Sequence, residues 1–413
     1  MSLTITIPTP LRVYTDGQGV IDVSGSTVSS ALESLVAKYP PLKKQLYTDE
    51  GQLRSFVNVY LNDEDIRYLK KGETAVAPGD AISIVPSIAG GSARQAIEPS
   101  AEWQMRSANI GTKPLARIGN TPLLRFESLT RAWPSIQILG KAEWVNPGGS
   151  SKDRAALNMV ETALKSGALS PDKRLLDATS GNTGIAYAMI GVAYGIPVTL
   201  CAPENISVER KRILTAYGAE IIWTDPLEGT DGSIRKAREL YQTSPHKYFY
   251  ADQYSNDANW QAHYHGTANE IWAQTEGTIT HFVAGLGTCG TFVGTTRRLK
   301  ELNPAVRALS LQPDSPLHGL EGLKHMPTAM VPKIYDPSLA DTELTISTEA
   351  AYDVVKRVAR SEGVLVGISA GAALAASEKL AQQISSSQEP HAVIVTVLPD
   401  SGDRYLSETF WTA

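Results

Sequence analysis

The spacing of hydrophobic and polar positions changes once along the chain, near residue 91. Before that point, short alternating runs predict strands, with a turn at Asp16-Gly17 joining the first two as a hairpin. The predicted strands are residues 4–8, 19–23, 56–61 and 81–85. One helical pattern, residues 27–38, lies among them and is ended by Pro40-Pro41. This order of strands around one helix predicts a small α+β roll.

From residue 113 onward, short apolar runs alternate with helical patterns, which predicts parallel sheets covered by helices. The predicted strands are residues 175–178, 196–200, 219–223, 281–284 and 364–368, and the predicted helices are 185–194, 208–217, 292–302 and a helix after residue 371. Residues 92–112 have few apolar positions and no clear period, so we expect a linker there. The expected organisation is a domain at 1–91, a linker at 92–112 and a second domain at 113–413.

A further helix is predicted directly after the polar, glycine-rich turn 146–151. Its apolar face is expected to comprise Ala155, Ala156, Met159, Val160, Ala163 and Leu164. Lys152 stands in the first turn, where the positive end of the helix dipole disfavours a cation. That cost is smaller for a neutral or imine-bound amine, as in a Schiff-base lysine. On this stretch alone, a solvated lysine beside a flexible turn is the simpler interpretation.

Composition excludes several classes of protein. The 413 residues are 42% hydrophobic and 20% charged with a net charge of −5, so no basic excess indicates nucleic-acid binding. Apolar runs are too short for a membrane span, and the first ten residues alternate like a strand rather than a signal peptide. Two cysteines, Cys201 and Cys289, indicate a reducing compartment, and we expect a cytoplasmic protein. His263 and His265 lack a third ligand at suitable spacing, so we expect no metal site.

Three predicted strand–loop–helix junctions are rich in Gly, Ser and Thr: residues 179–184, 287–291 and 369–371. In parallel sheets such loops form the ligand crevice, and helix N-termini there bind anions. Residues 287–291 make the best candidate phosphate cradle, because small residues expose backbone N–H groups. The loop lacks the Gly-Lys-Ser/Thr ending of a P-loop, and no acidic residue follows as in dinucleotide sites.

Six segments between Ile118 and Leu406, read together, resemble the fold-type II pyridoxal-phosphate (PLP) enzymes of the cysteine synthase and cystathionine β-synthase family. The segments are IGNTPLLR, NPGGSSKDRAALNM, ATSGNTG, GLGTCGT, GISAGAA and DSGDRYLS. The resemblance implies an α/β fold of two parallel-sheet subdomains with the cofactor in the cleft. It also implies that Lys152 holds PLP as an imine and, once released, serves as the base for the substrate's α-proton.

The same resemblance assigns roles to the three loops. It implies that Gly287, Thr288, Cys289, Gly290 and Thr291 bind the cofactor phosphate, that Asn182 contacts the ring hydroxyl, that Ser369 faces the pyridine nitrogen, and that Thr179, Ser180, Gly181 and Thr183 grip the substrate carboxylate. Cys289 stands where the family often has a small residue, and we expect it to pack as one. A serine at the ring nitrogen makes the cofactor a weaker electron sink, which suits α,β-elimination.

Lys324 bears on the choice of substrate. CysM-type enzymes that use O-phosphoserine often carry an arginine at this place, which is thought to read the phosphate. A lysine keeps the charge but loses the bidentate fork. O-phosphoserine and O-acetylserine therefore both stay open.

Residues 1–91 resemble the ubiquitin-like β-grasp sulfur carriers of the MoaD/ThiS class, and most of all the CysO type. FVNVYLNDEDIRYL and PGDAISIVPSIAGG carry this resemblance. It implies that an E1-like enzyme adenylates Gly91, which follows Gly90, and that the glycine becomes a thiocarboxylate. Here Ser92 continues the chain, so a protease acting after Gly91 is needed to free that carboxylate.

The expected function is cysteine biosynthesis in a homodimer, by β-replacement on a small amino-acid ester. Sulfur would come from the carrier thiocarboxylate, or from sulfide or thiosulfate. The alternatives are a sulfide-dependent O-acetylserine sulfhydrylase with a regulatory carrier domain, a cystathionine β-synthase, a serine or threonine dehydratase, and a non-catalytic sulfur-relay scaffold.

Overall fold

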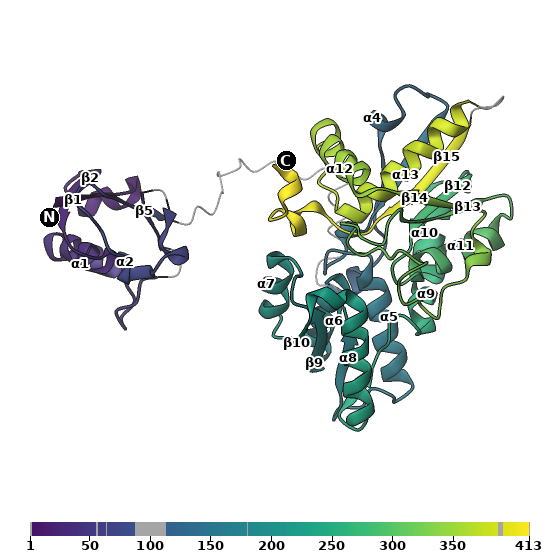
Figure 1. The fold of residues 1–413 in the computed structure, drawn as a ribbon, viewed down its shortest axis with the longest axis horizontal. Helices are drawn as coiled ribbons and strands as arrows, with labels where there is room; N and C mark the ends of the chain where they lie inside the picture. The colour runs from purple at the N-terminus through teal and green to yellow at the C-terminus, as the bar shows by residue number, and fades with distance from the viewer. Residues whose placement is uncertain are drawn as a thin grey trace. The chain divides into compact units, whose positions relative to one another are not determined.

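The computed structural model describes residues 2–54, 57–62, 64–86, 113–179, 181–386 and 391–412. The chain forms two compact units that divide after Ala108 (Figure 1). This division falls between residues 87 and 112, so the expected domain limits and the Gly90-Gly91 pair lie outside the described residues. The two units are considered separately below.

The N-terminal unit is a five-stranded mixed sheet in the order β2-β1-β5-β3-β4. Its strands are β1 (Ser2–Thr6), β2 (Val20–Ser24), β3 (Val57–Leu61), β4 (Glu64–Asp65) and β5 (Ala81–Pro86), and its α-helices are α1 (Val28–Lys38) and α2 (Lys43–Leu46). The predicted hairpin is confirmed, because β1 pairs antiparallel with β2. Strand β5 pairs parallel with β1 and antiparallel with β3. A 3-10 helix, Thr9–Tyr14, stands between the hairpin strands and was not predicted.

One hydrophobic core holds this unit together. The buried side of the sheet contributes Ile5, Ile21 and Ile82, and α1 contributes Leu32 and Leu35. Thr27 caps α1 by accepting a hydrogen bond from the backbone N–H of Ser30, and the Ser30 hydroxyl accepts one from the N–H of Thr27 in return. This reciprocal cap satisfies two of the N–H groups that a helix start leaves unpaired, which fixes where the helix begins.

The C-terminal unit contains two sheets. The four-stranded sheet has the order β10-β9-β8-β11 and is parallel throughout, and the six-stranded sheet has the order β14-β13-β12-β15-β7-β6. Only the short edge strand β6 runs antiparallel to its neighbour. The strands are β6 (Leu123–Arg125), β7 (Ile136–Ala142), β8 (Arg174–Ala178), β9 (Val198–Pro203), β10 (Glu220–Thr224), β11 (Tyr248–Tyr250), β12 (His281–Gly285), β13 (Arg307–Pro313), β14 (Thr342–Ile346) and β15 (Ala392–Leu398).

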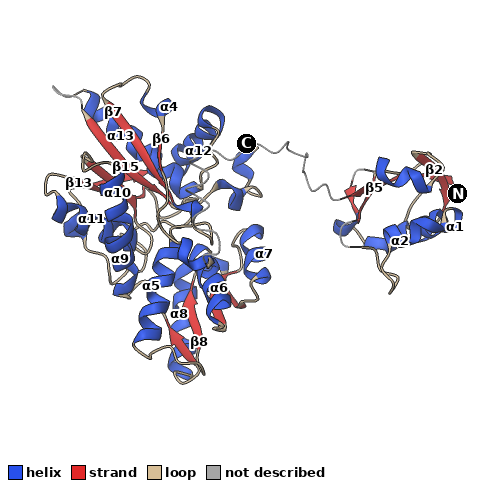
Figure 2. Cartoon of the chain, turned by 180° about the vertical axis from the view of Figure 1, so that it is seen from behind, coloured by secondary structure: helices blue, strands red, loops and turns tan. Residues whose placement is uncertain are grey.

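Helices cover both sheets (Figure 2). They are α4 (Glu127–Thr130), α5 (Lys152–Lys165), α6 (Asn182–Tyr194), α7 (Val208–Ala216), α8 (Gly229–Thr243), α9 (Asp257–Ala262), α10 (Ala268–Gln274), α11 (Gly290–Leu302), α12 (Thr348–Glu362) and α13 (Ile368–Ser385). Because helices lie on both faces, the central strands are buried on both sides: every residue of β9 and of β15 is buried. The prediction of parallel sheets covered by helices is therefore confirmed.

Two predictions of local structure were wrong. Residues 364–368 are not a strand: α12 ends at Gly363 in a left-handed conformation (φ 67°), and α13 begins at Ile368. Because α12 and α13 pack on each other, these residues are only the short connection of a helical hairpin, and Val366 makes a single bridge to Ser401. The second wrong prediction concerns Leu164, which we expected on the apolar face of the helix α5. Its side chain is 37% exposed because it lies at the edge of the buried face of that helix.

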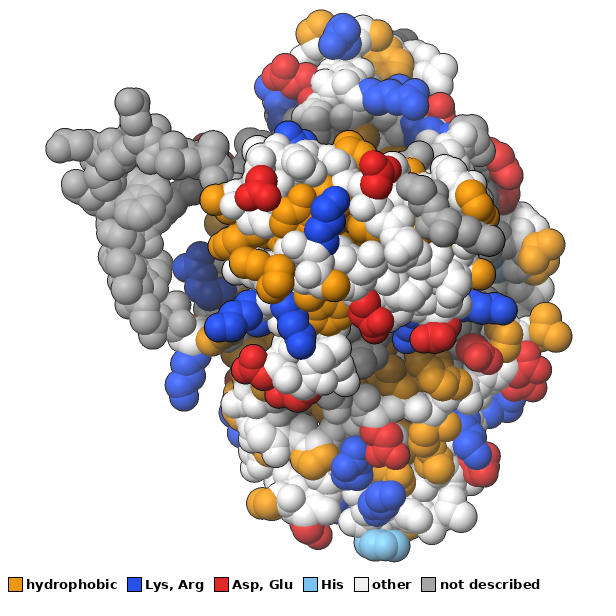
Figure 3. All heavy atoms as spheres, turned by 90° about the vertical axis from the view of Figure 1, so that its left-hand side faces the viewer, with side chains coloured by type: hydrophobic (Ala, Val, Ile, Leu, Met, Phe, Trp, Pro, Cys, Tyr) orange, Lys and Arg blue, Asp and Glu red, His pale blue; other side chains and the backbone are white. Residues whose placement is uncertain are grey.

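Two observations concern the helices and the charged side chains of the surface. None of the helices within the described ranges is long and apolar enough to cross a bilayer. Acidic and basic side chains are interspersed on the face drawn in Figure 3. This mixing agrees with the small net charge of −5.

Candidate active site

One pocket of the C-terminal unit collects most of the residues predicted to carry chemistry. Its lining includes Lys152, Thr179, Asn182, Thr183, Gly287, Thr288, Cys289, Thr291, Lys324 and Ser369. Gly181 and Gly290 belong to the same loops but are not part of the lining, and Ser180 lies outside the described residues. The starts of α5, α6, α11 and α13 all lie at this pocket. The loops before α6 and α11 follow the parallel strands β8 and β12, as expected, whereas α13 follows the helix α12.

Lys152 is the first residue of α5 and is partly exposed to the pocket. Desolvation lowers the pKa of its amine, and the negative charges of Asp400 and Glu143 only partly oppose that effect. No carboxylate among the described residues lies within 4.0 Å of its ammonium nitrogen. The position therefore favours the neutral, nucleophilic form of the amine.

A buried network of charges holds the start of α5 in place. Arg154 Nε lies 2.7 Å from Glu143 Oε2, and its Nη1 lies 2.6 Å from Glu270 Oε1. Lys141 Nζ lies 2.7 Å from the other oxygen of Glu270. Burial alone would raise the pKa of Glu270, but the hydrogen bonds and charges of Arg154 and Lys141 lower it to about 2. These ion pairs connect β7, α5 and α10, so the backbone that carries Lys152 is fixed on two sides.

The loop 287–291 is narrow because of its glycines. A Cβ at Gly290 would overlap Asn259 Oδ1, and a Cβ at Gly287 would overlap the carbonyl oxygen of Gly322. Cys289 adopts a left-handed conformation (φ 69°) directly before α11 begins. The first N–H groups of a helix have no partner inside the helix, so this turn can receive an anion. The geometry fits the predicted phosphate cradle.

His263, at which we expected no metal site, lies behind this cradle. It is buried in a short π-helix, His263–Thr267, and its Nε2 lies 3.2 Å from Thr291 Oγ1. Its Nδ1 lies 3.0 Å from Thr267 Oγ1. Burial, with smaller contributions from Arg154 and Lys152, lowers the pKa of His263 well below its usual value. A neutral imidazole is therefore in hydrogen-bond contact with Thr291 of the 287–291 loop.

The hydroxyl groups of Thr179 and Thr183, both in the loop 179–184, have different hydrogen-bonding roles. Thr179 Oγ1 accepts hydrogen bonds from the N–H groups of Gly181 (3.0 Å) and Gly184 (3.1 Å), which leaves its own proton for another partner. Thr183 Oγ1 instead donates to Gln253 Oε1 at 2.7 Å, since the Gln253 amide nitrogen donates to the carbonyl of Ala178 at 2.6 Å. Of these two hydroxyls, that of Thr179 therefore keeps a proton that it can donate to a ligand.

The amide of Asn182 is also fixed by its neighbours. Its Nδ2 donates to Asp400 Oδ2 at 2.6 Å, and its Oδ1 accepts from Arg404, which also donates to the carbonyl of Gly148. One hydrogen of Nδ2 remains for a ligand in the pocket. Ser369, in the first turn of α13, is buried against the same pocket.

Lys324 lies in the pocket wall as expected, but it has a partner that the sequence did not indicate. Its Nζ lies 2.6 Å from Asp231 Oδ1 in the first turn of α8, and 5.3 Å from the centre of the Tyr254 ring. The side chain is only 9% exposed. The predicted phosphate-reading cation is therefore already paired with a carboxylate.

Sequence reasoning did not single out five side chains of this region: Arg210, Gln253, Asp400, Arg404 and Tyr405. Arg210 forms an ion pair with Glu321 and donates to the Tyr405 hydroxyl. Asp400, Arg404 and Tyr405 belong to the segment DSGDRYLS, which was noted as a motif without a role for each residue. That segment could have identified Asp400, Arg404 and Tyr405 as site residues, whereas no sequence pattern pointed to Arg210 or Gln253.

The two cysteines are far from the reactive thiolate form. Cys201 and Cys289 are both buried free thiols, and burial raises the pKa of each to about 12. The positive charges of Lys324 and Lys152 oppose the rise at Cys289 without overcoming it. No cluster of three or more metal-ligating side chains occurs among the described residues.

Comparison with known proteins places both units. Residues 115–400 match the family model described as pyridoxal-phosphate dependent enzyme, and residues 5–91 match the ThiS family. A cysteine synthase of Aquifex aeolicus is 50% identical over 300 residues, which cover 72% of this chain and 91% of that protein. An O-acetylserine dependent cystathionine beta-synthase of Bacillus subtilis is 39% identical, over 71% of this chain and 95% of that protein.

Solved structures agree with the sequence comparisons. The cysteine synthase of Entamoeba histolytica superposes with a TM-score of 0.69 at 32% identity, covering 78% of this chain and 94% of that one. An O-ureido-L-serine synthase superposes with a TM-score of 0.67 at 35% identity, covering 74% of this chain and 96% of that one. The resemblances inferred from the motifs, and the fold that they imply, are confirmed.

Proposed function

The chain belongs to the family of pyridoxal-phosphate-dependent enzymes, and on this premise we propose that it makes cysteine by replacing the β-substituent of an O-activated serine with sulfur. The observation that carries the proposal is the unpaired, partly desolvated amine of Lys152 in the pocket with the 179–184 and 287–291 loops. Relatives named cysteine synthase, which the chain matches over nine-tenths of their length, support it. A ThiS-family domain is fused ahead of this enzyme.

Pyridoxal phosphate is the cofactor, and the pocket contains groups suited to each part of it. Lys152 would hold it covalently, and the loop 287–291 would hold its phosphate at the start of α11. The second amide hydrogen of Asn182 would meet the ring hydroxyl, and Ser369 the ring nitrogen. When bound, the cofactor withdraws electrons from the substrate's α-carbon, which makes the α-proton acidic.

The residues of this chain then bind the substrate and move its protons. Thr179 donates its hydroxyl proton to the substrate carboxylate, because both its acceptor positions are used by backbone N–H groups. The neutral amine of Lys152 takes the α-proton, and its lowered pKa keeps a larger fraction in the base form near neutral pH. The β-substituent leaves with its bonding electrons, a sulfur nucleophile forms the new bond to the β-carbon, and Lys152 returns the proton to the α-carbon.

The test is the rate of cysteine formation by the purified holoenzyme from O-acetylserine and O-phosphoserine, each with sulfide and with thiosulfate. We expect cysteine from at least one pair and little product without a sulfur source. Rapid pyruvate formation without sulfur would instead identify a serine or threonine dehydratase. Cystathionine formed from homocysteine in preference to cysteine would identify a cystathionine β-synthase.

We further propose that the sulfur donor is a thiocarboxylate at Gly91, formed after a protease cuts between Gly91 and Ser92. The match of residues 5–91 to the ThiS family, which stops at Gly91, supports this donor. A thiocarboxylate needs a free carboxylate, which Gly91 lacks while it is bonded to Ser92. An E1-like enzyme would then activate the released carrier.

Mass spectrometry of the protein from its native cells tests this donor. A fragment ending at Gly91, as carboxylate or thiocarboxylate, is the expected result. Full-length chain alone, with efficient cysteine synthesis from free sulfide, would contradict it and favour a regulatory role for the N-terminal domain. The same preparation, run on a sizing column, tests the further proposal that the enzyme is a homodimer.

A further inference from the structure

The charged groups of the pocket wall are arranged in pairs. Arg210 is paired with Glu321, and its guanidinium also lies 3.9 Å from Asp400. Lys324 is paired with Asp231 at 2.6 Å. Among the described lining residues, Lys152 is the one cation without a carboxylate within ion-pair distance. The wall thus offers little net positive charge to a ligand apart from the lysine expected to hold the cofactor.

Asp231 is held firmly at its place. One carboxylate oxygen accepts from Lys324, and the other accepts from the backbone N–H of Met330 at 2.9 Å. Its position in the first turn of α8 adds the favourable interaction of an anion with a helix N-terminus. The carboxylate therefore stays beside the ammonium instead of turning away when a ligand arrives.

A fixed carboxylate next to Lys324 changes what the pocket wall attracts. A phosphate dianion that approaches Lys324 also meets the negative charge of Asp231, which lies 2.6 Å from the ammonium nitrogen, so repulsion offsets part of the attraction. The site is partly dry, with Lys324 only 9% exposed, so water screens this repulsion weakly. A neutral acetyl ester has no net charge and does not meet this penalty.

We infer that Asp231 is a specificity-determining residue, which neutralises Lys324 and makes the pocket prefer serine esters with an uncharged leaving group over O-phosphoserine. This inference rests on the proposed function and refines it. Asp231 is not part of the pocket lining, so it acts through Lys324 without touching the substrate.

The main experiment compares kcat/KM for O-phosphoserine and O-acetylserine with sulfide, in the full-length holoenzyme and in Asp231→Asn. Asparagine keeps the shape and can still accept from Met330 N–H, but it removes the charge. We expect the phosphoserine to acetylserine ratio of kcat/KM to rise about tenfold, equivalent to about 1.4 kcal/mol. A change below about twofold would overturn the inference. Asp231→Glu, which keeps the charge, should stay near the wild-type ratio.

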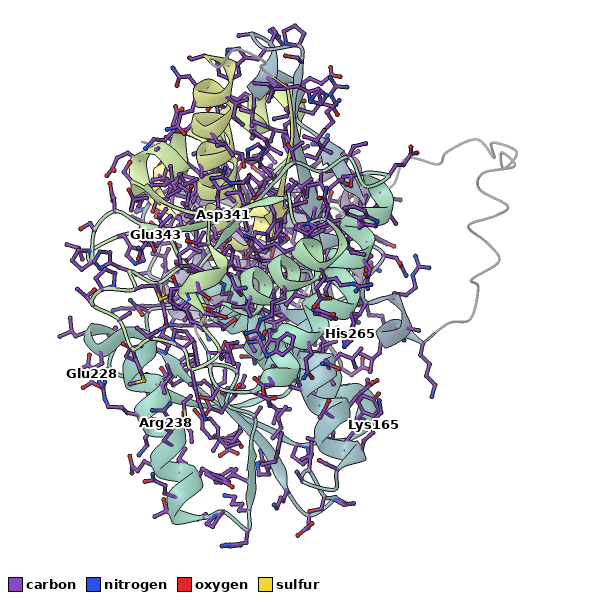
Figure 4. All side chains as sticks on the ribbon, turned by 90° about the vertical axis from the view of Figure 1, so that its right-hand side faces the viewer. Lys165, Glu228, Arg238, His265, Asp341 and Glu343 are labelled. Atoms are coloured by element: carbon purple, nitrogen blue, oxygen red, sulfur yellow. The ribbon has the colours of Figure 1, made fainter. Side chains whose placement is uncertain are left out.

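The chain offers a closely matched control in Asp341. Its carboxylate also joins a lysine and a backbone N–H: Lys300 Nζ lies at 2.8 Å and the N–H of Ala308 at 2.7 Å. The side chains of Asp341 and Asp231 are 28% and 27% exposed. Figure 4 labels Asp341 in the upper half of the enzyme unit, and Glu228 and Arg238, which flank Asp231 in sequence, in the lower half. Asp341→Asn should leave the ratio unchanged, and an equal rise would mean that net charge, not Asp231, sets it.

A binding measurement separates this inference from the proposed function. Calorimetry with inorganic phosphate should show roughly tenfold tighter binding to Asp231→Asn holoenzyme than to wild type, weakening as salt is added. Adding Lys324→Met to Asp231→Asn should abolish the gain, and a gain that persists would remove Lys324 from the explanation. If wild type makes cysteine from neither ester with sulfide, thiosulfate or the carrier thiocarboxylate, the proposed function fails, while the phosphate affinities still decide the role of Asp231.

Discussion

Lys152, at the start of α5, and Lys324, in the segment 319–327, line the same pocket. The residues around them place a carboxylate beside one amine and not beside the other. Lys152 has no carboxylate within 4.0 Å among the described residues, and desolvation lowers its pKa. Lys324 is paired at 2.6 Å with Asp231. An unpaired, desolvated amine loses its proton more readily and can react, whereas the adjacent carboxylate offsets the charge of Lys324. The chemistry of a lysine here depends on its neighbours.

Removing the unpaired amine should have the largest effect. Lys152→Ala is expected to lower kcat by about a hundredfold to ten-thousandfold, the usual range for a general base, and to abolish the absorbance of the covalently bound cofactor. Lys165→Ala is the control, because it lies at the other end of α5 with a side chain that is 79% exposed (Figure 4). Normal turnover and an unchanged spectrum in Lys152→Ala would contradict the assignment of Lys152 as the reactive lysine.

A bulky residue in the loop 287–291 tests whether this loop binds the cofactor phosphate. In Gly290→Leu, the side chain would collide with Asn259 and displace the loop that is expected to bind the phosphate. Overpacking of this kind costs about 1–3 kcal/mol, so the cofactor should bind roughly 5- to 150-fold more weakly. Cofactor content after dialysis gives the answer, with circular dichroism as the check on folding. Full retention would move the phosphate site away from this loop.

Removing the paired amine should affect one substrate more than the other. Lys324→Ala leaves the Asp231 carboxylate without its partner in the pocket wall, so O-phosphoserine should lose about thirtyfold more kcat/KM than O-acetylserine. Lys300→Ala removes the lysine of the matched pair with Asp341 and should affect both esters equally. Equal losses in Lys324→Ala would show that this lysine does not sense the charge of the leaving group.

The smallest effect is expected from changing Cys289, whose thiol pKa is influenced by the charges of both lysines. Their charges oppose the effect of burial, yet the pKa of the thiol stays raised to about 12. The thiol should therefore resist iodoacetamide at pH 8 in the native protein, and Cys289→Ser should change kcat by less than about twofold. Rapid labelling of Cys289, with Cys201 unlabelled, would reveal a stronger positive field at this loop than the structure implies.

Local patterns predicted the parts of the site that lie within one loop and its helix. The helix after residue 151, the loop at 287–291 and the loop at 179–184 each join a strand or turn to a helix start within a few residues. Their glycines and hydroxyl residues follow from the needs of that turn, so the sequence displays them.

Contacts between distant segments could not be predicted in the same way. Lys324 and Asp231 are 93 residues apart, and Asn182 and Asp400 are 218 apart. Their pairing depends on how whole helices and strands dock, which no local period records. For the same reason, the prediction of a strand at 364–368 was wrong: Val366 and Ile368 are buried in the core around α12 and α13 without belonging to a strand, and Leu365 is 44% exposed.

The position of β15 has a consequence for the order in which the protein can be made. This strand lies inside the six-stranded sheet, between β12 and β7, although it is translated more than a hundred residues after either. Tyr405, which follows it, lines the pocket, and Asp400 and Arg404 form hydrogen bonds with Asn182 of the lining. Until the ribosome releases residues 392–405, β7 and β12 stand with open edges that invite pairing with other chains. A stalled ribosome at residue 390 would therefore hold a nascent chain with every glycine loop synthesised, no working pocket and a strong need for a chaperone.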